Sequence, residues 1–167
     1  KLIAEKTEQY KPAIPMTCSE LILPKIKDLL LKKELIPNTV EIDIDGTIDN
    51  QKKIMAFEYY TPLVIENLVI NAIEAMNKKG KIVISNRFGN DGTSVEILVD
   101  DNGPGVRKEL RDIIFDRSYS KKEKGGIGLW WVKTHLERLG AAVYVENADI
   151  GGARFVLHFP ILDDLSL

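Results

Sequence analysis

The sequence predicts an α+β domain: a two-layer sandwich in which a mixed, mostly antiparallel sheet of about five strands packs against about three helices. Three observations lead to this prediction. Strand-like segments occur in pairs joined by short turns, helix-like segments separate the pairs, and glycines mark several of the boundaries. This order favours α+β over a doubly wound parallel sheet, in which strands and helices alternate singly.

The first part of the chain has a weaker pattern. Residues 1–18 contain Pro12 and Pro15 without a clear period, so we expect an arm or the end of a preceding helix. Ser19 is a candidate N-cap for a helix that continues through an apolar-rich stretch. Apolar and acidic residues then alternate over 40–44, which predicts a half-buried strand.

Helices and strands follow one another in the remainder of the chain. Thr61 and Pro62 look like the N-cap and first residue of a helix that runs to about Asn77. We expect a short helix near 107–115 and a longer one over 127–139. Two pairs of strands, each joined by a glycine-containing turn, are also predicted: 81–88 with 93–100, and 141–147 with 153–160.

Bulk composition bounds the class of protein. The chain has 167 residues, 44% of them hydrophobic and 29% charged, which suits one globular domain. A formal charge of −2 gives no reason to expect nucleic-acid or membrane binding. Cys18 is the single cysteine, so a disulfide framework is excluded and a reducing, cytoplasmic setting fits. No segment approaches the roughly 18 apolar residues of a membrane span, so we expect no direct membrane contact by this domain.

The helix that begins near Thr61 has two distinct faces. Asn67, Asn71 and Glu74 lie on one of them. A solvated outer surface is one explanation. The other is the polar wall of a nucleotide site, because an amide oxygen is a hard, neutral ligand that suits Mg²⁺. At about 100° per residue, the apolar positions share the opposite face: Ile65, Leu68, Val69, Ala72 and Met76.

Two glycine-rich segments are candidates for contact with a ligand. Residues 100–105, DDNGPG, end a strand with a sharp turn, where a carboxylate can accept a hydrogen bond from an exocyclic amine. Residues 124–129, KGGIGL, lead into a helix, whose free N–H groups suit phosphate. Each segment alone is equally typical of an ordinary turn or loop. The second is not a Walker A loop, since no Gly-Lys-Ser/Thr follows.

Together the three segments resemble one family. The order Asn-x-x-x-Asn-Ala, Asp-x-Gly-x-Gly and Gly-x-Gly-Leu is similar to the N, G1 and G2 boxes of the GHKL ATPases, which share the Bergerat fold. The resemblance spans about 62–160 and includes a closing Gly-Gly-x-x-Phe-x-x-x-Phe-Pro. It implies that residues 19–167 form an ATP-binding catalytic domain, with ATP and Mg²⁺ as cofactors.

The resemblance also implies roles for individual residues. Asn71 would be the Mg²⁺ ligand, and Asp101 would receive the adenine amino group. Gly103 and Gly105 would form the turn beside the base, and 116–124 would be a mobile ATP lid. The remaining candidates are contacts to the phosphates: Asn67, Lys121, Lys122, Lys124, Gly126, Ile127, Gly128 and Leu129. For the lysines, simple solvation is the alternative, while Lys121 and Lys122 are the candidates to reach the γ-phosphate.

Asn67 bears on the branch of the family. Asn67 lies four residues before the expected metal-binding asparagine. In the hydrolysing branches of the family, this position looks to be a glutamate that activates water. An amide cannot act as a general base near neutral pH, and Glu66 points about 100° away around the helix. The sequence therefore indicates phosphoryl transfer to an acceptor rather than efficient hydrolysis.

The resemblance to sensor histidine kinases further implies partners. The acceptor histidine would lie before Lys1 on a separate dimerisation domain. Residues 1–18 would be the end of that domain. Neither His135 nor His158 has an acceptor-like setting, so both are expected to be structural. A homodimeric parent protein and a downstream response regulator are implied, and no nucleic acid. The alternatives are a hydrolysing GHKL ATPase, an anti-sigma-type protein-serine kinase and a non-catalytic nucleotide-binding module.

Three positions depart from the family pattern. Glu74 stands where many histidine kinases carry a lysine that contacts phosphate, and Lys124 stands where the first glycine of the G2 box is usual. Ala153 replaces a hydroxyl residue often found before the last strand. All three positions bear on nucleotide affinity.

Overall fold

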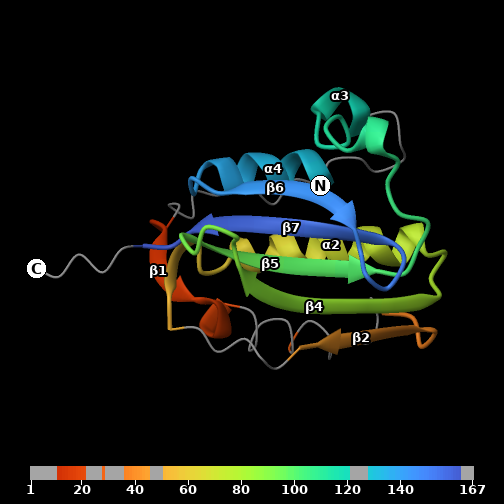
Figure 1. The fold of residues 1–167 in the computed structure, drawn as a ribbon, viewed down its shortest axis with the longest axis horizontal. Coiled ribbons are helices and arrows are strands. Elements are labelled where there is room, and N and C mark those ends of the chain that lie inside the picture. Colours follow the sequence, from red (N-terminus) through yellow and green to blue (C-terminus); the bar gives the residue numbers. More distant parts are fainter. Residues whose placement is uncertain (1–10, 22–27, 29–35, 46–50, 121–127, 163–167) are drawn as a thin grey trace, which may run out of the picture.

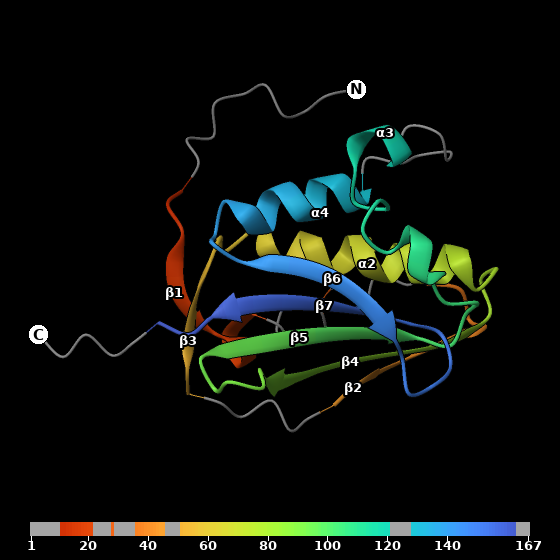
Figure 2. The same ribbon diagram turned by 45° about the horizontal axis from the view of Figure 1, so that its top comes forward.

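The computed structural model describes residues 11–21, 28, 36–45, 51–120 and 128–162. Its main layer is a five-stranded sheet, and helices α2 (Thr61–Ala75) and α4 (Gly128–Glu137) lie together on one face of it (Figure 1, Figure 2). The strands follow in the order β2 (Val40–Ile44), β4 (Gly80–Phe88), β5 (Ser94–Asp101), β7 (Ala153–Pro160) and β6 (Ala142–Asn147).

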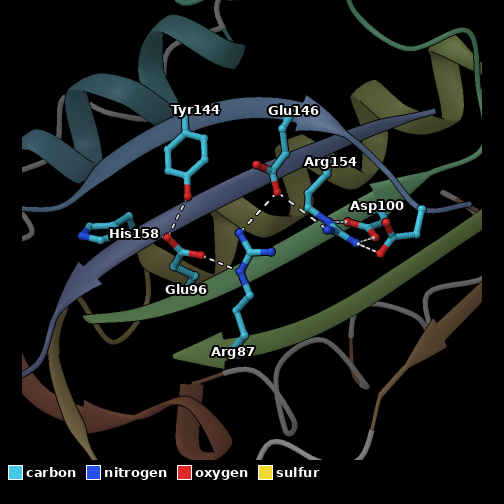
Figure 3. A network of polar contacts seen from close by, with 8 residues as sticks. Arg87, Glu96, Asp100, Tyr144, Glu146, Arg154 and His158 are labelled. Atoms are coloured by element: carbon cyan, nitrogen blue, oxygen red, sulfur yellow. Dashed lines mark hydrogen bonds and ion pairs between the residues drawn. The ribbon is translucent and has the colours of Figure 1, made fainter. Parts of the chain in front are cut away.

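Strand pairing confirms the predicted mixed sheet. Strands β2 and β4 run parallel, whereas β4–β5, β5–β7 and β6–β7 are antiparallel. Because neighbouring residues of a strand point to opposite faces, Val95, Ile97 and Val99 of β5 join the core beneath the helices. Glu96 and Asp100 alternate with them and point to the other face, which carries a network of charged side chains (Figure 3).

Helix α2 has the predicted apolar face. Ile65, Leu68 and Val69 are at most 2% exposed and pack into the core. Its start differs from the prediction, because the N-cap is Tyr60 and Thr61 is already helical. The Thr61 hydroxyl instead accepts a hydrogen bond from the Phe57 N–H at 2.9 Å, so it serves the preceding turn.

The N-terminal part is more ordered than the expected arm. Strand β1 (Ile14–Thr17) pairs antiparallel with β3 (Lys53–Ala56) in a separate two-stranded sheet. Residues 18–21 are helical, and the cap is Thr17 rather than Ser19. The Thr17 N–H donates to Glu20 Oε2 at 2.8 Å and the Glu20 N–H donates to Thr17 Oγ1 at 3.3 Å, a reciprocal capping box.

The segment after β5 also differs from the prediction. Residues 107–115 form turns around a short 3₁₀ helix, η1 (Lys108–Leu110), instead of one continuous helix. A further short helix, α3 (Arg117–Ser120), stands outside α4 (Figure 2). No helix within the described residues is both long enough and apolar enough to cross a bilayer.

Candidate functional site

A cavity of about 640 Å³ opens between α2, the end of β5, the start of β7 and the start of α4. Its lining combines the predicted polar residues of α2 with both glycine-rich segments. Six of the predicted site residues line it: Asn67, Asn71, Asp101, Gly105, Gly128 and Leu129. The fold therefore brings together residues from three separate parts of the sequence.

Asp101 is a deeply buried polar residue of the cavity lining. It is the last residue of β5 and only 3% exposed. The N–H groups of Gly103 and Ala153 both donate to its Oδ1, at 2.8 and 3.3 Å. Burial raises the pKa of the Asp101 carboxyl, and these two hydrogen bonds partly oppose the increase. Among the described residues no donor is recorded for Oδ2, which can accept a hydrogen bond from a ligand.

Gly152 packs directly against Asp101, and it was not among the site residues predicted from the sequence. A β-carbon at Gly152 would lie 2.3 Å from both the carbonyl oxygen and Oδ1 of Asp101 and 2.6 Å from the Gly103 nitrogen. Real β-carbons essentially never approach other atoms this closely. The signal was present in the Gly-Gly pair before the last strand, which looks like an ordinary turn in sequence.

Another part of the cavity lining brings the amides of α2 close to the start of α4. A β-carbon at Gly128 would lie 3.5 Å from Asn67 Oδ1 and 3.6 Å from Asn71 Nδ2, so both side chains approach this helix terminus closely. Asn67 donates from Nδ2 to the Leu63 carbonyl at 3.1 Å. Free N–H groups at a helix start and neutral amides make a region that suits phosphate and a hard cation.

Charged residues on the cavity wall include one that was not predicted. Arg107 lines the cavity, and within the described residues it is the only lysine or arginine to do so. Glu74 lines it as well. The other predicted phosphate contacts, Lys121, Lys122, Lys124, Gly126 and Ile127, lie outside the described residues.

Neither histidine lines the cavity, and each contacts a side chain from another element. His135 is 7% exposed, and its Nε2 lies 3.1 Å from the Thr61 hydroxyl, which links α4 to the start of α2. Desolvation by burial, with a smaller contribution from Arg138, lowers the pKa of His135 to about 4, so the ring is neutral near pH 7. His158 lies on β7 with Nδ1 3.1 Å from Glu96.

The family described as "Histidine kinase-, DNA gyrase B-, and HSP90-like ATPase" matches residues 62–163 of this chain. The chain belongs to this family. The match includes α2, the turn after β5 and the Gly-Gly pair before β7, so it covers every wall of the cavity. Membership of an ATPase family also supports ATP as the nucleotide.

Individual relatives are named as sensor proteins or sensor histidine kinases. Sensor protein CitS of Halalkalibacterium halodurans is 35% identical over 153 residues, which cover 82% of this chain and 27% of that protein. The chain thus spans about a quarter of the length of this relative. The solved catalytic domain of histidine kinase ThkA aligns with a TM-score of 0.67 and 27% identity, covering 90% of this chain and 96% of that one.

A second ThkA structure shows such a domain in a larger assembly. Histidine kinase ThkA in complex with response regulator protein TrrA aligns with a TM-score of 0.68 and 26% identity, covering 90% of this chain and 42% of that one. The alignment with these histidine kinase structures confirms the fold class predicted for this chain, an α+β sandwich.

Proposed function

We propose that this chain is the ATP-binding catalytic domain of a sensor histidine kinase, which transfers the γ-phosphate of ATP to a histidine on a separate dimerisation domain. The observation that carries the proposal is the shared cavity, which is lined by both Asp101 and Asn71. In the complete protein we expect a homodimer that passes the phosphate to a response regulator. Relatives named as sensor proteins and a neighbour solved with a response regulator support this wider assignment.

Within the cavity, Asp101 recognises the base. Its Oδ2, to which none of the described residues donates, would accept a hydrogen bond from the adenine amino group, while Oδ1 stays fixed by the Gly103 and Ala153 N–H groups. A hydrogen bond to a charged acceptor contributes about 1.5–3 kcal/mol when water is excluded. Gly152 leaves the space that brings β7 against this carboxylate.

Near the start of α4, Asn71 would hold Mg²⁺ through its amide oxygen. The donor chemistry fits, because Mg²⁺ accepts a neutral oxygen ligand and keeps waters and phosphate oxygens as its other ligands. When bound, the ion neutralises charge on the transferring phosphate. The N–H groups at the start of α4 and the Arg107 guanidinium would bind the remaining phosphate charge.

The chain's own residues favour transfer over hydrolysis. Asn67 lines the cavity four residues before Asn71, and its amide cannot take a proton from water. Glu66 is not among the residues that line the cavity. A histidine acceptor supplies its own nucleophilic nitrogen and so needs less assistance from a base than water does.

Asp101→Ala tests the base assignment. We expect ATP affinity, measured by calorimetry, to fall roughly ten- to a hundredfold, which is about 1.5–3 kcal/mol. Asp112→Ala is the matched control, because Asp112 is exposed and does not line the cavity. Equal affinity in the two variants would refute the assignment of Asp101.

Asn71→Ala tests the metal assignment in the parent protein. We expect Mg²⁺-dependent transfer of ³²P from ATP to the acceptor histidine to be lost, while the thermal unfolding midpoint stays close to that of the wild type. Asn90→Ala, in the exposed turn between β4 and β5, should retain transfer. Normal transfer by Asn71→Ala would remove Asn71 from the metal role, and sustained ATP turnover without an acceptor would favour a hydrolysing ATPase.

A further inference from the structure

An ion pair lies directly behind the base-binding carboxylate, on the outer face of the sheet. Asp100 precedes Asp101 on β5, and Arg154 follows Ala153 on β7. Asp100 and Arg154 are direct partners in the β5–β7 register. Since side chains alternate along a strand, this pair points away from the cavity while Asp101 and the start of β7 face it.

The pair is largely buried and doubly hydrogen-bonded. Arg154 donates from Nε to Asp100 Oδ1 at 2.8 Å and from Nη2 to Asp100 Oδ2 at 2.7 Å. The side chains are only 12% and 7% exposed. Figure 3 shows the guanidinium facing Asp100, with Glu146 approaching it from β6. Two parallel hydrogen bonds fix direction as well as distance, so the pair holds the two strands in one alignment.

We propose that Arg154 is a positioning residue for base recognition: through its ion pair with Asp100 it fixes the junction of β5 and β7 at which Asp101 and the Ala153 N–H meet. The inference rests on the proposed function, because it takes Asp101 as the ligand of the base. Arg154 itself does not line the cavity, so it would act without contacting the nucleotide. Its role is to set the position and the charge state of the Asp101 carboxylate.

The effect of Arg154 on the charge of Asp101 can be measured separately from its effect on folding stability. The charged groups near this junction are Asp100 on β5 and its partner Arg154 on β7, which also contacts Glu146 on β6 and the exposed Asp149. Glu74 on α2 and Arg107 after the turn line the same cavity as Asp101. Burial raises the pKa of Asp101 most, and the negative charge of Asp100 raises it further. Arg154 offsets that charge. Loss of Arg154 should therefore raise the pKa of Asp101, whereas loss of the Asp100 charge should lower it.

Because the two substitutions should shift the pKa of Asp101 in opposite directions, the pH dependence of ATP binding tests the proposal. We would measure the ATP dissociation constant of Arg154→Gln and Asp100→Asn in the whole chain between pH 4.5 and pH 8, in steps of about 0.5. Base recognition needs ionised Asp101, so binding is lost as pH falls through its pKa. We expect the midpoint of this loss to move upward in Arg154→Gln and downward in Asp100→Asn, each by about 0.3–1 in pH. Titration of ATP itself is the same in all variants and cancels in the comparison.

Two controls accompany these variants. Arg87→Gln breaks the Arg87–Glu96 pair, which lies on the same face and joins β4 to β5 at 2.7 Å, away from Asp101. Asp149→Asn removes an 88% exposed carboxylate that contacts Arg154, and leaves Asp100 in place. Both controls should keep the wild-type midpoint and an ATP affinity within about twofold, whatever they do to thermal stability.

The outcomes separate the possible roles. Midpoints that move together, or that do not move in either variant, would overturn the positioning role and leave the pair as a purely structural one. If Arg154→Gln does not fold, Arg154→Lys decides, because it keeps the charge and gives up the paired hydrogen bonds: an ATP affinity roughly tenfold below the wild type supports the positioning role, and wild-type affinity overturns it. Failure of the wild type to bind ATP at any pH would instead contradict the proposed function.

Discussion

Gly152→Ala is the substitution whose effect follows most directly from the geometry. The added methyl group would lie 2.3 Å from two oxygens of Asp101, whereas ordinary van der Waals contact begins at 3.4 Å. The start of β7 must therefore retreat by about 1 Å, because the nearest atoms belong to backbone or to a fixed carboxylate. Overpacking of this kind costs about 1–3 kcal/mol of folding stability. The retreat also moves the Ala153 N–H away from Asp101, so we expect ATP affinity to fall roughly ten- to a hundredfold.

The neighbouring glycine provides the comparison. Gly151 has a φ of +105°, and no described atom lies within 4 Å of the place that a methyl group would take, so Gly151→Ala adds backbone strain without a contact at Asp101. Both variants should unfold at lower temperature in a thermal melt. Calorimetry with ATP should show a large loss of affinity only for Gly152→Ala. If the two variants bind ATP equally well, the argument that Gly152 makes room for the base-binding carboxylate is wrong.

Three further predictions concern pH, charge and metal. His135 is neutral in the fold with a pKa of about 4 against an ordinary 6.5, so the unfolded chain gains the proton first as pH falls. The contribution of neutral His135 to the free energy of unfolding is complete above pH 6.5, and about 3 kcal/mol of it is lost as pH falls towards 4. In denaturant melts, the free energy of unfolding of His135→Phe should therefore depend less on pH than that of the wild type. Arg107→Ala should weaken ATP binding several-fold but leave adenosine binding unchanged, whereas Lys108→Ala, one residue further on, should affect neither; an equal loss for both ligands would exclude a phosphate contact. Adding EDTA should weaken ATP binding by the wild type but not by Asn71→Ala, and an equal EDTA effect in calorimetry would contradict the metal role.

Local patterns were sufficient for the parts of the site that lie on regular elements. The polar residues of α2 recur at spacings of four and three, which places them on one face of any helix, and Asn67 and Asn71 do line the cavity. Asp101 was predictable for a similar reason, because a strand followed by Asn-Gly-Pro-Gly must end there. The hairpins were equally clear from alternation and turn residues.

Features that depend on distant contacts could not be predicted. Strand β1 contains Pro15 and is short, and only its pairing with β3, far along the chain, makes it a strand. Thr61 looked like an N-cap, but its hydroxyl lies between the Phe57 N–H and the ring of His135, which comes from α4. Gly152 looked like a loop residue, and only the three-dimensional approach of β7 to Asp101 gives it a role.

The cavity draws its walls from α2, the end of β5, the start of β7 and the start of α4, which are far apart in sequence. A molecule bound there would act as a non-covalent cross-link between these segments. At a concentration of one hundred times its dissociation constant, it would add about 2.7 kcal/mol to the free energy of unfolding. Amide hydrogen exchange should then slow even in the middle of β5 and β7, where those amides exchange only when the whole domain opens.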